Sequence, residues 1–341
     1  MKSNSNTRIY WLLALVLCGT ILIWQCREAT EPDLPPTPTE QLSVPTFDRD
    51  SAYAYVEKQV SFGPRVPNSA AHLATKNWLA GKLREFGWTV SEQGFEAKAY
   101  TGETLRATNI IAQSNPTAQR RLLLGAHWDS RHIADKDADA SVQDQPILGA
   151  DDGASGVGVL LEIARQIQQH PLPNLGVDIV LFDVEDHGYD ERVDRPDDDD
   201  GTTWGMGSQY WGKHPHTDPK QYRWGILLDM VGSKDAEFGK EEISRQVAPK
   251  LVNDIWSLAN RMGYGKYFID REAGSVIDDH YFVMLNAGVP MIDIINQPGG
   301  RGFGDYHHTQ ADNMDVINAR TLKAVGQVTL AAIYRHANGQ L

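Results

Sequence analysis

Three short segments are apolar at nearly every position, and they constrain the fold more than any other feature of the chain. They read RLLLGAH (121–127), VDIVLFDVE (177–185) and WGILLDMVG (224–232). A strand that is apolar on both faces must be covered on both sides, as strands in the middle of a parallel sheet are. Two further apolar segments, TNIIAQS (108–114) and VPMIDIIN (289–296), are also typical of strands. The chain is therefore predicted to form a central sheet that helices cover on both faces.

Segments with helical periodicity alternate with these strands. They occupy residues 51–63, 69–87, 153–169, 248–263, 278–288 and 318–338. This alternation predicts an α/β fold class: a single domain with a mixed, mostly parallel sheet flanked by helices on both faces. Residues 191–204, which contain four consecutive aspartates, interrupt the pattern and are predicted to form a loop insertion. We find no internal repeat and no second domain.

The N-terminus has the layout of an export signal. Lys2 and Arg8 precede an apolar run from Ile9 to Trp24, and residues 27–46 are rich in Pro, Thr and Glu. We therefore expect residues 1–26 to be a signal sequence or membrane anchor, residues 27–46 to be an extended tether, and residues 47–341 to be the folded domain. Cys18 and Cys26 are the two cysteines of the chain. Either could be lipidated, so an uncleaved signal anchor and a lipoprotein both stay open.

The net charge and the cysteine content limit which binding partners and which cellular location are expected. The net charge is -13, which argues against binding to nucleic acid. A folded domain without cysteine has no disulfide, and export without disulfides suits a bacterial periplasm. The expectation is an exported, periplasmic protein that associates with the membrane through its N-terminal segment. The sequence does not indicate an oligomeric state.

Acidic residues and histidines gather at the ends of the predicted strands and helices. The segments are GAHWDS (His127, Asp129), GADDGASG (Asp151, Asp152), FDVED (Glu185, Asp186), LLDMVG (Asp229), IDDH (Asp278, Asp279, His280) and DYHHT (His307, His308). In open α/β sheets, ligands bind outside the carboxyl ends of the strands. A set of Asp, Glu and His without Cys is typical of a catalytic zinc site with three protein ligands and one open position.

Each segment also has a simpler interpretation. Asp151 and Asp152 could be helix N-caps, and His127 could be a hydrogen-bonded structural residue. His307 and His308 could lie on a solvated surface loop. The occurrence of all these segments in order, each at the end of an element, favours a shared site.

In this order the segments resemble the M28-type zinc aminopeptidase superfamily, over about residues 50–338. The flanking segments LLDMVGSKDAEF, DDHYFVMLNAGVPMIDII, GSQYW and FGPRVPNSAAH are similar to its glutaminyl cyclase branch, of the animal type and in its bacterial members. The resemblance implies one zinc per chain and cyclisation of the N-terminal Gln of peptides or proteins to pyroglutamate, with release of ammonia.

The resemblance also implies roles for individual residues. Asp152, Asp186 and His308 match the zinc ligands, and Glu185 matches the general acid/base. Asp229 and Asp278 match the carboxylates that support Glu185, and we expect them to share a proton. Trp204 is the candidate for one wall of the substrate pocket.

The chain departs from the animal cyclases at two positions. Asp186 stands where they usually have Glu, so the metal ligand is one methylene shorter. His307 stands where a Trp commonly precedes the zinc-binding His, which changes a pocket wall. The alternative is a dizinc aminopeptidase of the same superfamily, in which Asp152 would bridge two metals and His127 and Asp229 would bind the second.

Overall fold

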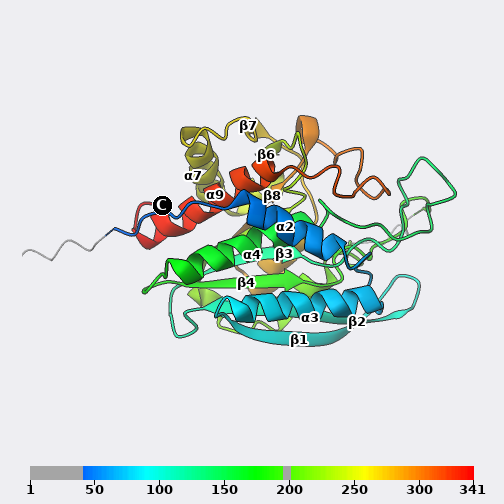
Figure 1. Cartoon of the computed structure of the whole chain (residues 1–341), viewed down its shortest axis with the longest axis horizontal. Coiled ribbons are helices and arrows are strands. Elements are labelled where there is room, and N and C mark those ends of the chain that lie inside the picture. Colours follow the sequence, from blue (N-terminus) through cyan, green and yellow to red (C-terminus); the bar gives the residue numbers. More distant parts are fainter. Residues whose placement is uncertain (1–40, 195–200) are drawn as a thin grey trace, which may run out of the picture. The chain divides into compact units, whose positions relative to one another are not determined.

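The central feature of the fold is a six-stranded sheet with the strand order β1-β2-β4-β3-β5-β8 (Figure 1). The computed structural model describes residues 41–194 and 201–341. The strands of this sheet are β1 (Thr89–Lys98), β2 (Thr104–Ser114), β3 (Arg121–His127), β4 (Gly176–Phe182), β5 (Tyr222–Asp229) and β8 (Met291–Ile295).

The sheet is mixed and mostly parallel, as predicted. Strand β3 pairs in parallel with β4 and β5, and β5 pairs in parallel with β8, whereas β2 runs antiparallel to both β1 and β4. His127 lies opposite Phe182, and Asp229 lies opposite Ile295. The carboxyl ends of four strands therefore meet at one edge of the sheet.

Helices cover both faces of the sheet. They are α2 (Arg49–Val60), α3 (Ala70–Glu85), α4 (Ala154–Gln169), α5 (Met206–Lys213), α6 (Glu242–Val247), α7 (Pro249–Arg261), α8 (Asp279–Ala287) and α9 (Ala319–Ala337). Helix α4 packs against α2 and α9, and α5 packs against α8. Every helix predicted from the sequence is present.

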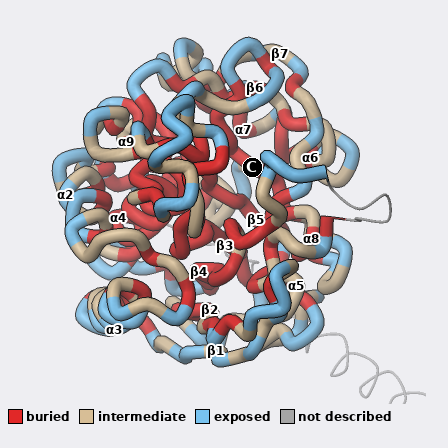
Figure 2. Tube along the Cα trace, turned by 90° about the vertical axis from the view of Figure 1, so that its right-hand side faces the viewer, coloured by how far each residue is buried: buried red, intermediate tan, exposed pale blue. Residues whose placement is uncertain are grey.

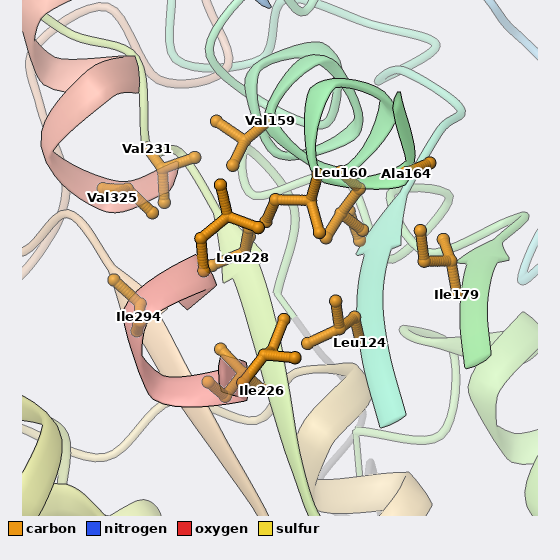
Figure 3. Close-up of a cluster of buried hydrophobic side chains, with 14 of the residues drawn as sticks. Leu124, Val159, Leu160, Ala164, Ile179, Ile226, Leu228, Val231, Ile294 and Val325 are labelled. Carbon is orange, nitrogen blue, oxygen red and sulfur yellow. The ribbon is translucent and has the colours of Figure 1, made fainter. Parts of the chain in front are cut away.

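Successive residues of β3 enter two different apolar clusters. Leu122 and Leu124 join the larger cluster with α4 and α9, whereas Leu123 joins the cluster that contains Trp211 of α5 and Val283 of α8. Figure 3 shows side chains of β3, β4 and β5 against those of α4, and Figure 2 shows the buried strands at the centre. This two-sided burial explains why the sequence of β3 lacks a polar face.

Some elements were not predicted from the sequence. Strand β1 lies at the edge of the sheet and is at most half-buried along its length, so its sequence TVSEQGFEAK has no strong apolar signal. A small sheet of β6 (Phe238–Lys240) and β7 (Phe268–Glu272) lies beyond β8. These strands are short, and their sequences show no distinct period.

The compact unit begins at Leu42. The backbone N–H of Leu42 donates to Asn338 Oδ1, and Asn338 Nδ2 donates to the carbonyl of Leu42, so the segment is fixed beside the end of α9. The predicted signal or anchor at 1–26 and most of the predicted tether at 27–46 lie outside the described residues. Among residues 41–194 and 201–341, none of the helices has the length and apolar character needed to span a bilayer.

Candidate active site

The loops that follow the strands enclose a cavity of about 330 Å³. Every residue with an assigned role lines this cavity except His127, which contacts two of the lining carboxylates, and Asp129, Asp151, Asp279 and His280 do not line it. The predicted residues that line it are Asp152, Glu185, Asp186, Trp204, Asp229, Asp278 and His308, and His307 lines it as well. The structure therefore brings together segments that are up to 156 positions apart in the sequence, from Asp152 to His308.

Glu185 and Asp186 lie in a tight turn rather than on the strand itself. Strand β4 ends at Phe182, three residues before Glu185, and Val184 between them has a φ of 55°. A β-branched residue with positive φ is strained by about 1–3 kcal/mol and persists where its surroundings fix the backbone. The turn is therefore held against a local conformational preference.

Asp129 fixes this turn. Its two carboxylate oxygens accept hydrogen bonds from the backbone N–H groups of Glu185 (3.1 Å) and Asp186 (3.2 Å). The carbonyls of Val184 and Glu185 accept bonds from residues 206 and 205 on the other side of the turn. Both ends of the acidic pair are thus anchored, so its two side chains can occupy different environments.

Asp186 has the surroundings of a metal ligand. Its side chain is buried, and neither carboxylate oxygen has a hydrogen-bond partner in the described part of the chain. Burial, and next the charge of Asp152, raise the pKa of Asp186 well above its usual range. A buried carboxylate that accepts no hydrogen bond is unfavourable unless positive charge compensates it, and the nearest protein cation, Arg131, lies 3.6 Å away. A divalent cation at this position would supply that compensation.

His308 and Asp152 complete a set that fits zinc. His308 Nε2 lies 3.2 Å from Asp186 Oδ1 and 3.8 Å from Asp152 Oδ2. Ligand atoms around a tetrahedral zinc with bonds of 2.0–2.2 Å are roughly 3.3–3.6 Å apart. Burial lowers the pKa of His308 well below its usual value, so the ring is neutral and offers a lone pair. The donor chemistry of these three residues fits a zinc ion, and His308 lies close to both carboxylates.

His127 lies between Asp152 and Asp229. Its Nε2 is 2.9 Å from Asp152 Oδ1 and 3.3 Å from Asp229 Oδ1. Burial by itself lowers the pKa of His127, but the hydrogen bonds to Asp129, Asp152 and Asp229 together raise it well above its usual value. The donor atoms of His127, Asp152 and Asp229 lie within 4.8 Å of one another, so the second metal set of the aminopeptidase alternative is also assembled.

Glu185 is half-buried at the cavity wall. Desolvation is the largest influence on this carboxyl and raises its pKa well above the usual range. The charges of Asp278 and Asp186 act in the same direction, and His127 opposes them. Burial likewise raises the pKa of Asp229 to about 7. The site therefore contains carboxyl groups that can hold a proton near neutral pH.

Asp278 is the N-cap of α8, and one of its oxygens accepts a bond from the N–H of Asp279. Its Oδ2 has no hydrogen-bond partner among the described residues, so no hydrogen bond joins it to Asp229. The influence of Asp278 on the pKa of Asp229 is electrostatic. The sharing of a proton between these two carboxyls stays a prediction.

The indole of Trp204 forms part of the cavity wall and contacts the side chains of Arg131 and His308. The guanidinium carbon of Arg131 lies 4.7 Å from the centre of the indole, and the His308 ring is nearly parallel to it at 6.0 Å. A side chain at Gly188 would overlap the indole, so the glycine lets the turn after Asp186 pack directly on Trp204. Trp204 is thereby fixed next to the candidate metal ligands.

The simpler interpretations of the acidic pair before α4 and of the two histidines are wrong. Helix α4 begins after Gly153, which forms no side-chain cap, so neither Asp151 nor Asp152 caps it. Instead, the buried carboxylate of Asp312 accepts the N–H groups of Asp151 (2.8 Å) and Asp152 (3.1 Å). Because these bonds fix the backbone, the side chain of Asp152 can face the cavity. His307 and His308 are buried rather than solvated.

Two buried arginines, which the sequence analysis did not assign, brace the site. Arg65 donates to the carbonyls of Trp128 (2.8 Å) and Gly149 (2.8 Å), and so ties together the loops that carry His127 and Asp152. The segment FGPRVPNSAAH contains Arg65, but its contacts are to backbone atoms 63 and 84 positions away. Nothing in the local sequence identifies such partners.

Arg131 braces the opposite side. It pairs with Asp135 (Nε–Oδ1, 3.0 Å) and donates to the carbonyls of Asp186 and Tyr189. Its Nη1 lies 3.6 Å from Asp186 Oδ1. Arg131 therefore contacts both the candidate ligand Asp186 and the indole of Trp204.

The fold and the donor set define a metal-dependent α/β enzyme. The model of the family described as "Peptidase family M28" matches residues 109–333. The chain belongs to this family.

Individual relatives narrow the comparison. The glutaminyl-peptide cyclotransferase of Drosophila melanogaster is 25% identical over 284 residues, which cover 76% of this chain and 73% of that protein. The glutaminyl cyclase of Bacteroides thetaiotaomicron, solved with N-acetylhistamine, is 48% identical with a TM-score of 0.82. A Zn-dependent exopeptidase from Parabacteroides distasonis is 49% identical with a TM-score of 0.81. Each of these two structures covers 86% of this chain and 99% of its own.

Asp129 provides a direct test of how the turn positions the metal ligand. In Asp129→Asn, one of the two backbone N–H groups of the acidic pair loses its carboxylate acceptor, so Asp186 is less well oriented. Residues that orient a metal ligand through hydrogen bonds typically contribute about 10–100-fold to metal affinity or activity. We expect a loss of that size in zinc affinity, measured by competition with a chelator.

Asp139→Asn is the matched control, because Asp139 also accepts a backbone N–H but is exposed and does not line the cavity. Its zinc affinity should equal that of the wild type. An unchanged affinity in Asp129→Asn would show that the turn does not need this carboxylate.

Proposed function

We propose that the chain is a zinc-dependent glutaminyl-peptide cyclotransferase that converts the N-terminal Gln of peptides or proteins to pyroglutamate and releases ammonia. The observation that carries this proposal is the acidic turn: Glu185 and Asp186 are adjacent, and both line the cavity. Only Asp186 lies beside the other candidate ligands, at 3.2 Å from His308. The likeness to glutaminyl cyclases over most of the chain supports the same function.

Zinc held by Asp152, Asp186 and His308 would act as a Lewis acid on the side-chain amide oxygen of the substrate. The α-amine nitrogen of the substrate forms a bond to the amide carbon and gives up a proton. Glu185 takes this proton and returns it to the departing nitrogen, so the carbon–nitrogen bond breaks and ammonia leaves. The substrate's own amine is the nucleophile, and no water is consumed.

The surroundings of Glu185 suit this exchange. A group that first accepts and then donates a proton works best with a pKa near the working pH. Burial and the nearby acidic residues raise the pKa of Glu185 from its ordinary range. Asp229, with its pKa raised to about 7, and Asp278 are proposed to support Glu185 by holding a proton at its side. Trp204 is proposed as a wall of the pocket for the Gln side chain.

We propose one zinc per chain. His127 lies between Asp152 and Asp229, which raise its pKa and so favour a positive charge where the second metal of a dizinc aminopeptidase would bind. The assembled set of His127, Asp152 and Asp229 favours the aminopeptidase alternative, and the likeness to a Zn-dependent exopeptidase is compatible with it. The two functions differ in product, so a peptide assay separates them.

The assay compares two peptides that differ in their first residue. The full chain is incubated with a Gln-initiated and with a Leu-initiated peptide, and the products are followed by mass spectrometry. We expect the Gln peptide to lose the mass of ammonia and the Leu peptide to stay intact. Release of free leucine without cyclisation of the Gln peptide would identify an aminopeptidase instead.

Substitutions of the acidic pair test the division of roles. Glu185→Gln keeps the shape of the side chain but cannot accept a proton, so turnover should fall by about 10²–10⁴-fold while bound zinc is retained. Asp186→Ala removes a ligand, so both zinc and turnover should be lost. Glu85→Gln and Asp235→Ala, both at exposed positions, are the controls and should keep both. A Glu185→Gln variant with a near-normal rate would contradict the proposed roles.

We further propose that the protein is exported to a periplasm and held at the membrane by residues 1–26, as a signal anchor or as a lipoprotein. Its substrates would then be exported peptides or proteins whose processing exposes an N-terminal Gln. The apolar run from Ile9 to Trp24 and the Pro-rich segment after it support this proposal. After cell fractionation the full chain should sediment with membranes. Recovery in the soluble fraction would contradict membrane attachment.

A further inference from the structure

His307, which stands where the animal cyclases commonly have a Trp, packs beside the candidate metal ligands. The residue is 7% exposed, and its ring stacks on His308 at 3.6 Å and against Phe303 at 4.4 Å. The donor atoms of Asp152, His307 and His308 lie within 4.8 Å of one another. His307 could therefore serve the site either as a further metal ligand or as a hydrogen-bond donor.

Lys136 decides between these two roles. Its Nζ lies 2.9 Å from His307 Nδ1. An ammonium group has three donors and no acceptor, so Nδ1 must accept the bond and the ring proton must reside on Nε2. A protonated nitrogen has no lone pair for a metal. Lys136 thereby excludes His307 from the metal's ligands and makes Nε2 a donor.

The position of Lys136 is itself well defined. Its backbone N–H donates to the carbonyl of His308 at 3.2 Å, and its Nζ also pairs with Glu191 at 3.1 Å. In the same loop, Asp137 Oδ2 accepts the N–H of Gln310 at 2.9 Å. Hydrogen bonds thus join the two loops on either side of the histidine pair. These bonds fix the position of Lys136 relative to His307.

The Nε2–H group of His307 has no protein acceptor within hydrogen-bond distance in the described part of the chain. The carboxylate that faces it, Asp152 Oδ2, is 3.8 Å away. Because His307 lines the cavity, this donor is available to a molecule bound there. It lies beside the candidate metal position, where the amide oxygen of a substrate would be placed.

We propose that His307 is a further catalytic residue, which donates a hydrogen bond from Nε2 to the substrate amide oxygen as negative charge develops on it. Lys136 is the positioning residue that imposes the required tautomer. The proposal rests on the cyclotransferase function proposed above. A donor fixed in advance toward developing charge stabilises the transition state more than the ground state.

The tautomer can be measured without any turnover. Nitrogen-15 NMR of the zinc-loaded full chain distinguishes a protonated from an unprotonated ring nitrogen, and the loss of one signal in His307→Phe assigns His307 among the 11 histidines. We expect Nε2 to be protonated and Nδ1 unprotonated. In Lys136→Met this pattern should change, and in Lys136→Arg, which retains a donor, it should persist. A proton on Nδ1 in the wild type would overturn the proposal.

Kinetics and metal content test the catalytic role. His307→Phe keeps an aromatic ring in the stack but removes the donor. Loss of such a donor typically costs about 10²–10³-fold in kcat, so we expect a loss at the lower end of that range, with little change in KM and full zinc content. Lys136→Met should lower kcat in the same direction and should add little to the loss in the double variant. Lys266→Met, at an exposed lysine that also lies over an aromatic ring, is the control.

The outcomes are separable. Loss of zinc in His307→Phe would identify His307 as a metal ligand, and an unchanged kcat would identify it as an inert wall; either result overturns the proposal. If the wild type does not cyclise Gln peptides at all, the proposed function fails. The NMR and zinc measurements still report on the Lys136–His307 pair in that case.

Discussion

The concentration of buried carboxylate groups at one edge of the sheet is the constraint on which the rest of the site depends. They belong to Asp129, Asp152, Asp186, Asp229, Asp278 and Asp312. Ionised carboxylates in a low-dielectric interior are costly unless hydrogen bonds or positive charges compensate them. Backbone N–H groups compensate Asp129 and Asp312, and His127 lies between Asp152 and Asp229. Arg131 lies 3.6 Å from one carboxylate oxygen of Asp186, but neither oxygen has a hydrogen-bond partner in the described part of the chain, so a cation fits well beside this side chain.

The same constraint explains the strained backbone around the cavity. Val184, Met230 and His308 all have positive φ, and each is either a site residue or the direct neighbour of one. Such conformations persist where surrounding interactions fix them, and they commonly occur at functional sites. For Val184 the fixing group is the buried side chain of Asp129, which accepts the N–H groups of the two residues that follow Val184. Tertiary contacts thus stabilise backbone conformations that are locally unfavourable, and these conformations orient the ligand and acid/base side chains.

The sequence was most informative where a physical signal is local. Strands such as β3 and β5 are buried on both faces, so their apolar runs and their polar ends are visible without a structure. Edge strand β1 lacks that signal because it is partly exposed along its whole length. The rule for strand ends pointed to Asp186, whereas the order of the motifs and the family resemblance grouped Asp152 and His308 with it. Their separate roles came from the family resemblance and stay predictions until tested.

Contacts between residues far apart in the chain could not be predicted from the sequence. Arg65 binds carbonyl groups, which every residue has, so its partners leave no trace in composition or spacing. The effect of Lys136 on His307 likewise requires two loops that are 171 positions apart to meet.

The most direct test of the central claim is anomalous diffraction at the zinc edge from crystals of the zinc-loaded full chain. We expect a single peak within bonding distance of Asp152, Asp186 and His308, with His127 still between Asp152 and Asp229. A second peak between His127 and Asp229 would contradict this expectation.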